Sequence, residues 1–289
     1  MFSQLAALSI LLMTACASIP KNPGYRAVWY DDFNGIKGAM VDSSKWNQVT
    51  IKNAATLKQI QIYTDRASNA HLSGDGQLYI VPKKGGTSPR YWSSARLESD
   101  GSWACKAGEA MIFQSEIRVP DFTNALTKYN GLWPAFWTKG QSCRDGTAKG
   151  FKCGEWDIFE VTNNMGKINQ GTLHFENLDG AHNGSLHGIT QYAGGVYHTW
   201  AFKVDRRNSN WKKQSLTWYV DGKVFYHVTG ATIGIFSEWK ILAQSPFFII
   251  LNLAIGGEAG SYGGLATEST VDGFEASMRV KYVAVYKSN

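Results

Sequence analysis

The sequence predicts an all-β protein, a two-sheet β-sandwich of the jelly-roll type. Runs of aromatic, β-branched and other apolar residues recur along the chain, and clusters of Gly, Asn, Asp and Pro separate them. Only residues 52–62 and 234–243 tolerate a helical interpretation, and both segments are short. A β-propeller is the alternative fold for so many strands, but it would need a blade repeat, and the sequence shows none.

Each expected strand shows either the alternation of apolar and polar residues that is typical of a half-buried strand or the continuous apolar run of a fully buried one. The clearest hairpin is LTWYV-DGK-VFYHV, because Asp221-Gly222 is a preferred pair for a tight turn. In chain order, the expected strands are residues 77–81, 110–119, 132–137, 155–161, 171–175, 198–204, 216–220, 224–228, 246–255 and 278–286.

The first residues predict export. Residues 1–19 carry no charged side chain, LAALSILLM forms a short apolar core, and ACAS offers small residues around a cut after Ala17. We therefore expect residues 1–17 to be a signal peptide, although its start lacks the usual basic residue, and the mature protein to be secreted, extracellular or in the cell wall. Lipoprotein processing is the alternative and would make Cys16 a lipidated N-terminus.

Residues 18–289 are expected to form a single domain, because they contain no Pro/Ser-rich linker, break in composition or repeat. The net charge of +6 is spread over pairs such as Lys83-Lys84 and Arg206-Arg207 in loop-like context, which favours solvated loops over a nucleic-acid surface. No second segment approaches the length of a membrane span. We expect a monomer that binds no nucleic acid and, after signal removal, no membrane.

Three cysteines remain after removal of the signal peptide. In an oxidising compartment, Cys143 and Cys153 are expected to close the loop QSCRDGTAKGFKC as a disulfide. Cys105 would then be a buried free thiol. No CxxC or His-rich spacing indicates a zinc site.

The segment GEWDIFE, residues 154–160, places three carboxylates in an otherwise apolar strand. Side chains alternate faces along a regular strand, so Glu155 and Asp157 share one face while Glu160 would point away from both. One extra residue bulged out between Asp157 and Glu160 would return all three to the same face. The spacing therefore predicts a β-bulge in this strand.

Three neighbouring carboxylates on a sheet are costly, because burial and like charge both disfavour joint ionisation. Retaining glycoside hydrolysis needs such a group: a carboxylate nucleophile and a protonated acid roughly 5–5.5 Å apart. Adjacent anions raise the pKa of the acid, so that one carboxyl stays protonated while the other is ionised. A solvated edge strand is the structural alternative for these three residues.

GEWDIFE resembles the E-x-D-x-x-E signature of glycoside hydrolase family 16, in the bulged form of its laminarinase-like, endo-β-1,3-glucanase branch. Several further segments resemble this family in the same order along nearly the whole mature chain: VWYDDFNG (28–35), SSARLES (93–99), GLWPAFW (131–137), GTLHF (171–175), WYVDGK (218–223), NLAIGG (252–257) and VKYVAVY (280–286). The resemblance implies a jelly roll of the concanavalin A-like lectin/glucanase type and a catalytic role for the single domain.

The resemblance implies Glu155 as the nucleophile and Glu160 as the general acid/base. Asp157 would lie between them and tune both pKa values by sharing a proton or a hydrogen bond. Trp156 and Ile158 alternate away from the cleft and are expected to pack in the core.

Four further residues are expected to contact substrate. Trp133 and Trp137 are four residues apart and so lie on one face, where they would be sugar platforms or, alternatively, core residues. Arg96 resembles a substrate-contacting arginine, and a salt bridge to a neighbouring acid is the alternative. His174 would lie beside the three carboxylates and hydrogen-bond near the catalytic acid; a core histidine with its hydrogen bonds satisfied is the alternative.

The sequence departs from the family in its last strand, where many members carry an Asp that contributes to a structural calcium site. This chain has Lys281 there, and an ammonium group would repel a cation. We therefore expect no metal and no cofactor, and we expect Lys281 to pair with Asp31 or Asp32 near the first strand.

The expected function is a secreted retaining endo-glycosidase that hydrolyses β-1,3- or mixed β-1,3(1,4)-glucans, with the polysaccharide as its partner. A transglycosylase or a β-galactan-cleaving enzyme on the same fold is the first alternative, because the double-displacement chemistry is common to all of them. A glucan-binding lectin without activity is the second, but the presence of both Glu155 and Glu160 argues against it.

Overall fold

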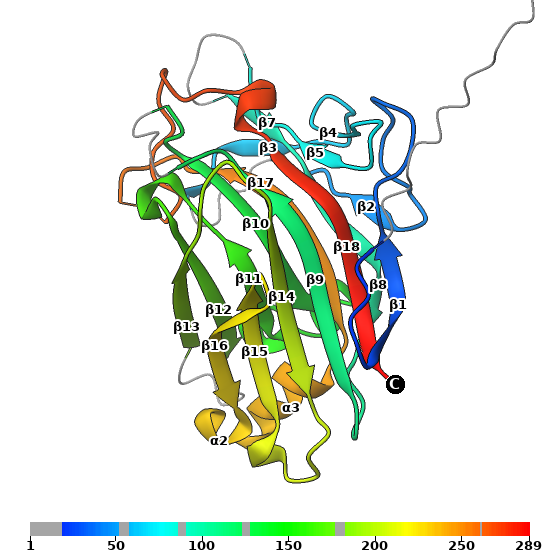
Figure 1. The fold of residues 1–289 in the computed structure, drawn as a ribbon. Coiled ribbons are helices and arrows are strands. Elements are labelled where there is room, and N and C mark those ends of the chain that lie inside the picture. Colours follow the sequence, from blue (N-terminus) through cyan, green and yellow to red (C-terminus); the bar gives the residue numbers. More distant parts are fainter. Residues whose placement is uncertain (1–18, 52–57, 86–90, 123–127, 177–182, 261) are drawn as a thin grey trace, which may run out of the picture.

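The computed structural model describes residues 19–51, 58–85, 91–122, 128–176, 183–260 and 262–289 (Figure 1). The predicted signal peptide, residues 1–17, and Cys16 lie outside these residues. Within the described chain, no helix is long and apolar enough to cross a membrane.

Two antiparallel sheets face each other and form the β-sandwich that the sequence predicts (Figure 1). The eight-stranded sheet has the order β16-β15-β14-β9-β18-β5-β4, with β1 paired to β18. Its strands are β1 (Tyr25–Asp31), β4 (Ala70–Leu72), β5 (Leu78–Ile80), β9 (Ala110–Arg118), β14 (His198–Asp205), β15 (Ser215–Val220), β16 (Lys223–Thr229) and β18 (Met278–Ser288).

The seven-stranded sheet has the order β13-β12-β11-β10-β17-β8-β2 and carries the carboxylate-rich segment on its third strand, β11. Its strands are β2 (Trp46–Gln48), β8 (Arg96–Trp103), β10 (Leu132–Gly140), β11 (Glu155–Glu160), β12 (Ile168–Glu176), β13 (Asn183–Gln191) and β17 (Phe247–Ile255). Strands far apart in sequence are neighbours here, since β10 pairs with both β11 and β17.

The remaining elements are small. Three short strands form a third sheet: β3 (Gln61–Tyr63), β6 (Lys83–Lys84) and β7 (Trp92–Ser94). The α-helices of the described chain are α1 (Gln141–Arg144), α2 (Gly230–Ile233) and α3 (Phe236–Gln244), of which α2 and α3 lie at one end of the sandwich (Figure 1). Single 3₁₀ turns occur at Gly150–Cys153, Asn163–Met165, Trp211–Lys213 and Gly273–Ala276.

Aromatic side chains from both sheets fill the space between the layers. Trp156 of β11 stacks on Phe247 of β17 with ring centroids 3.6 Å apart, and it meets Phe202 and Phe113 of the opposite sheet at 4.5 and 5.5 Å. Such rings bury large apolar areas, and the burial of apolar area is the main favourable contribution to the free energy of folding. Trp156 and Ile158 are both buried, as predicted for the side of β11 that faces away from the cleft.

Each expected strand coincides with an observed one and extends at most one residue beyond either of its ends, and the Asp221-Gly222 turn joins β15 to β16. Both turn residues have positive φ, 48° and 75°, as a tight hairpin turn of this kind requires. Of the two segments that tolerate a helical interpretation, 234–243 is mostly α3. In the other, 52–62, Gln61–Tyr63 forms strand β3 by pairing with β7, and residues 52–57 lie outside the described chain.

The pairing expected for Lys281 is also wrong. Lys281 is the extra residue where the β18–β9 register shifts between Val280 and Tyr282, and its ammonium lies 2.6 Å from Glu116 of β9. Asp31 instead turns inward at the end of β1. There it accepts hydrogen bonds from the Trp46 indole at 2.8 Å and the Lys45 ammonium at 3.2 Å.

Candidate active site

Strand β11 contains the predicted bulge. Against β10, Glu160 is opposite Ala135, Phe159 is opposite Phe136, and Asp157 is opposite Trp137, so that Ile158 is the extra residue. The bulge reverses the alternation after Asp157 and returns Glu160 to the face that carries Glu155 and Asp157. All three carboxylates therefore lie on the outer face of the seven-stranded sheet, opposite the core side chains Trp156 and Ile158.

The bulge leaves backbone groups without ladder partners, and two side chains satisfy them. Pairing of β11 with β12 ends at Asp157 and Thr172. The indole of Trp218, from the opposite sheet, donates to the Asp157 carbonyl at 2.8 Å, and the Glu160 amide donates to Asn169 Oδ1 at 2.9 Å. Buried backbone groups need such partners, so these two contacts make the bulge tolerable inside the sandwich.

Glu155 pairs with a lysine. Lys139 is opposite Glu155 in the β10–β11 register, and its Nζ lies 2.9 Å from Glu155 Oε2. Burial and the charge of Asp157 raise the pKa of Glu155, while the charge and hydrogen bond of Lys139 oppose that rise. Lys139 thus favours the ionised form of this carboxyl.

Asp157 is 5% exposed and lies 3.2 Å from His174 Nε2 on the neighbouring strand β12. Burial disfavours the imidazolium, but the hydrogen bond to Asp157 and the charges of Asp157 and Glu155 outweigh it and raise the pKa of His174. The histidine therefore lies on the strand beside the three carboxylates, as predicted, but it bonds to Asp157 and not next to Glu160.

Glu160 has a drier environment and no cationic partner among the described residues. Burial and the charge of Asp157 raise its pKa well above the usual range, which favours the protonated acid. The Trp133 indole donates to Glu160 Oε1 at 2.9 Å. Tyr262 packs on Trp133 with ring centroids 5.1 Å apart, and its buried hydroxyl lies near Glu160 without a well-formed hydrogen bond. The surroundings thus favour a protonated Glu160 and, through Lys139, an ionised Glu155.

Trp137 and Arg96 form a second group on the same face. The guanidinium of Arg96 lies 4.9 Å from the Trp137 ring centroid, and the Trp137 indole donates to Asn252 at 2.6 Å. Arg96 also binds Glu98 through two nitrogens, at 2.6 and 2.8 Å, so the salt bridge weighed as the alternative from the sequence is present. Trp133 and Trp137 share one face, as predicted, and both indole N–H groups are hydrogen-bonded.

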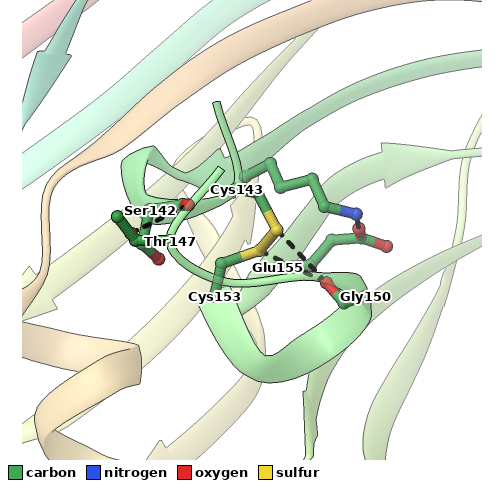
Figure 2. Close-up of a disulfide and its surroundings, with 7 residues drawn as sticks. Ser142, Cys143, Thr147, Gly150, Cys153 and Glu155 are labelled. Carbon is green, nitrogen blue, oxygen red and sulfur yellow. Dashed lines mark hydrogen bonds and ion pairs between the residues drawn. A yellow bond between two sulfur atoms is a disulfide. The ribbon is translucent and has the colours of Figure 1, made fainter. Parts of the chain in front are cut away.

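The predicted disulfide between Cys143 and Cys153 is present beside the site (Figure 2). Cys105 is a buried free cysteine. Cys153 is two residues before Glu155, and Figure 2 shows the bridge next to this carboxylate. Phe151, inside the disulfide loop, stacks on the His174 ring with centroids 4.6 Å apart. The disulfide therefore fixes the segment that packs against the histidine.

Donor atoms of Glu155, Asp157 and His174 lie within 4.8 Å of one another, so a metal ion has to be considered. These residues do not suit a cation, because the Lys139 ammonium already binds Glu155 at 2.9 Å and would repel it. His174 Nε2 is also engaged with Asp157. The group fits proton chemistry better than metal binding.

Sequence reasoning missed Lys139, Phe151, Tyr262 and Asn252. Lys139 had a usable signal, because it is two residues after Trp137 in a strand and must share its face. Asn252 also had one, as the single polar residue in the apolar run of β17. Phe151 and Tyr262 reach the site from loops, and the chain pattern gives no such signal for them.

No family model matches the sequence. Among proteins of known function, the glucan endo-1,3-beta-glucosidase of Cryptopygus antarcticus is 30% identical over 243 residues, which cover 79% of this chain and 80% of that protein. The chain belongs to glycoside hydrolase family 16, in its laminarinase-like branch. Glucan endo-1,3-beta-glucosidase A1 of Niallia circulans is also 30% identical, over 93% of this family 16 chain. The chain spans 39% of the length of that relative.

Solved structures agree with the membership in family 16. The endo-1,3-beta-glucanase of Streptomyces sioyaensis matches with a TM-score of 0.79 and 26% identity, over 93% of this chain and 99% of that one. The laminarinase of Rhodothermus marinus matches with a TM-score of 0.70 and 26% identity, over 91% and 97% of the two chains. The predicted jelly-roll β-sandwich is thereby confirmed.

Proposed function

We propose that this family 16 protein is a retaining endo-glycosidase that hydrolyses β-1,3- or mixed β-1,3(1,4)-glucans. The β-bulge at Ile158 carries the proposal, because it places Glu155, Asp157 and Glu160 on one face in different surroundings. The relatives named above act on β-1,3-glucan according to their names, which supports a glucan over a galactan.

In the first step, an oxygen of Glu155 attacks the anomeric carbon while Glu160 protonates the glycosidic oxygen of the leaving chain. The bond from the anomeric carbon to that oxygen breaks, and a covalent glycosyl-enzyme ester remains on Glu155. In the second step, Glu160 takes a proton from water, whose oxygen attacks the same carbon and releases Glu155 as a carboxylate. Two inversions return the product to the β configuration.

The environments suit these roles. Lys139 favours an ionised Glu155, as a nucleophile requires. Burial and the charge of Asp157 favour a protonated Glu160, as a general acid requires. Asp157 lies between Glu155 and Glu160 in the strand and is hydrogen-bonded to His174. Its charge acts on both glutamates, so the ionisation of the three carboxyls is coupled.

The sugar-binding proposal rests on the outer face of β10. Trp133 lies against the proposed acid and Trp137 against Arg96, so both rings border the site where the glycosidic bond would lie. A pyranose offers an apolar face and hydroxyl groups, which suit indole rings and the hydrogen-bonding groups of Arg96 and His174. We propose these four residues as substrate contacts.

We extend the proposal to the whole chain. Residues 18–289 would be one catalytic domain, secreted as a monomer after removal of residues 1–17, without cofactor or nucleic-acid partner. N-terminal sequencing of the exported protein should begin at Ser18; a lipid-modified Cys16 at its start would contradict this part.

A product-profile assay tests the function. Laminarin, barley mixed-linkage glucan and a β-galactan are each incubated with the wild type and with Glu155→Gln, and reducing ends and oligosaccharides are measured. The proposal predicts cleavage of laminarin that the variant loses by about 10³-fold or more. Longer oligosaccharides without net hydrolysis would favour a transglycosylase, cleavage of galactan alone would overturn the glucan assignment, and binding without cleavage would indicate a lectin.

A further inference from the structure

Lys139 is held in a fixed place beside Glu155. Strand pairing sets the two residues opposite each other, and their side chains are only 22% and 12% exposed. The Lys139 Nζ lies 5.8 Å from the ring centroids of both Trp137 and Phe151. Long lysine side chains on a surface are usually mobile, but the two rings and the carboxylate restrict this one.

The contact distinguishes the two oxygens of Glu155. Lys139 donates to Oε2 at 2.9 Å, and Oε1 accepts no hydrogen bond from the described residues. One oxygen is therefore held in place, and the other is not held by a hydrogen bond from the described residues. A nucleophilic carboxylate needs this arrangement, because its attacking oxygen must be free and its plane must be fixed.

The charges around Glu155 come from three sides. Asp157 lies on its own strand and His174 on β12, and their electrostatic effects on Glu155 have opposite sign. On β10, Lys139 supplies the one Lys or Arg ion pair that Glu155 makes with the described residues. Farther along this face, the cation of Arg144 is paired with Glu98.

We propose that Lys139 is a positioning residue for the nucleophile: it holds Oε2 of Glu155, leaves Oε1 to attack the sugar, and stabilises the carboxylate that departs when the glycosyl-enzyme is hydrolysed. This inference rests on the proposed function. The role belongs to a residue outside the carboxylate signature and the substrate contacts expected from the sequence.

The two steps use Lys139 differently. When Oε1 bonds to the anomeric carbon, the bond to the leaving oxygen breaks, Glu160 supplies its proton, and Glu155 loses its negative charge. When water attacks, its proton passes to Glu160, the electron pair of the ester bond returns to Glu155, and the carboxylate forms again beside the ammonium. The ion pair thus stabilises the free enzyme and the departing carboxylate, but not the ester.

This difference predicts a specific kinetic change. In Lys139→Met, a neutral side chain of similar length, hydrolysis of the ester should slow about tenfold or more because the departing carboxylate has lost its cation. Attack on the ester then limits turnover, so kcat and KM both fall. The ratio kcat/KM near the pH optimum falls less than kcat, because a carboxylate without its cation is a stronger nucleophile and this gain offsets the lost positioning. An activated aryl β-glucoside oligosaccharide should show a burst of released phenol.

Direct titration of Glu155 tests the same inference without any substrate. The side-chain carboxyl is followed by carbon-13 NMR in glutamate-labelled protein, with its signal assigned from Glu155→Gln. The midpoint should move to higher pH in Lys139→Met, return toward the wild-type value in Lys139→Arg, and stay unchanged in Lys152→Met. Lys152 is the matched control, because it lies in the disulfide loop beside the site but pairs with Glu176 at 3.4 Å.

An unchanged Glu155 midpoint in Lys139→Met, or a fall in kcat/KM as large as the fall in kcat, would overturn the inference. If Lys139→Met fails to fold, Lys139→Gln provides the neutral variant for the same measurements. If the wild type hydrolyses no glycan but the Glu155 titration midpoint still moves in Lys139→Met, the proposed function is refuted while the role of the ion pair stands. The two failures are therefore distinguishable.

Discussion

Glu155 and Glu160 are the same kind of residue in two different environments. Glu155 meets an ammonium group at 2.9 Å, whereas Glu160 is buried and meets the indole N–H of Trp133. Burial and neighbouring negative charge raise the pKa of both groups, but among the described residues a cation opposes the rise for Glu155 alone. One strand can therefore supply a nucleophile and an acid at the same pH.

This arrangement costs stability near neutral pH, and Glu160→Gln should reveal the cost. Between the unfolded pKa of a glutamate and the raised pKa of Glu160, the folded state holds a proton that the unfolded state has lost, so stability falls as pH rises through this window. The amide carries no charge. We expect the variant to be about 1–2 kcal/mol more stable than the wild type at pH 7–8, with little difference near pH 4.

Thermal unfolding of the wild type and Glu160→Gln from pH 4 to 8 checks this prediction. Glu275→Gln is the control, because Glu275 is exposed and paired with Lys128, which lowers the pKa of its carboxyl. This control should show no gain in stability at neutral pH. A Glu160→Gln variant less stable than the wild type at pH 7–8 would show that Glu160 is not held protonated by its surroundings.

At the residue scale, the sequence predicted the three carboxylates, because charged residues in an apolar strand stand out. It also predicted the face shared by Trp133 and Trp137 from their spacing. It missed Tyr262, which reaches Glu160 from a loop, because no local pattern says where a loop side chain will pack. His174 was placed on the correct strand, but its ring bonds to Asp157 although the strand register sets it opposite Glu155, and the sequence gives no signal for such a diagonal contact.

At the element scale, the bulge in β11 makes a second prediction possible. Deleting Ile158 would leave Glu155, Asp157 and Glu160 at alternate positions of a regular strand, so all three would still share one face. The deletion removes a buried core side chain and should destabilise the protein by about 2–4 kcal/mol. We expect it to retain activity within about 100-fold of the wild type.

Activity on glucan and thermal unfolding of the deletion variant are the measurements. Glu160→Ala in the same deletion background is the control and should remove the remaining activity. A folded deletion variant without activity would contradict the account, because it would show that the bulge does more than return Glu160 to the face of the other two carboxylates.

The disulfide loop makes a third prediction. The bridge between Cys143 and Cys153 spans a sequence separation of 10 residues, and closing a loop of that length is worth about 2–3 kcal/mol. Its reduction should lower Tm by about 5–10 °C and reduce activity, because Phe151 would no longer be held against His174.

Differential scanning calorimetry with and without dithiothreitol measures this effect. The Cys143→Ser/Cys153→Ser variant should have the lower Tm in both conditions and show no response to the reductant. A wild type whose Tm and activity ignore dithiothreitol, with the free thiols confirmed by labelling, would refute the role given to the loop.

The bulge was predictable because side chains alternate faces along a strand. The three carboxylates can share the cleft face only if one extra residue shifts this alternation. The groups that make it tolerable were not, since Trp218 and Asn169 come from other strands and their contacts depend on the packing of the whole sandwich. The segment 52–62 was ambiguous for a related reason: Gln61–Tyr63 is a strand because β7 pairs with it, although its own sequence permits a helix.

At the scale of the whole molecule, the two sheets were predictable from the recurrence of apolar runs, whereas the strand order was not. Neighbours such as β10 and β17 are separated by more than a hundred residues, and no local signal reports such pairings. The resemblance to a family along the whole chain supplied the topology. It did not supply the local change at Lys281, whose partner is Glu116 and not Asp31 or Asp32.

The ion pair between Lys281 and Glu116 leads to a fourth prediction, that the fold needs no bound metal. A metal present at 100 times its Kd would add about 2.7 kcal/mol to stability, enough to shift Tm by several degrees. We therefore expect an excess of EDTA to leave Tm and activity unchanged. A fall in Tm that added calcium reverses would contradict this prediction.

The central claim is that Glu155 and Glu160, brought to one face by the bulge, carry out a double displacement. The most direct test is proton NMR of the anomeric signals during the first minutes of glucan hydrolysis, before mutarotation mixes the two forms. A double displacement releases the β-anomer of the new reducing end first, and the α-anomer follows slowly. Appearance of the α-anomer first would mean a single inversion by water and would contradict the role of Glu155 as nucleophile.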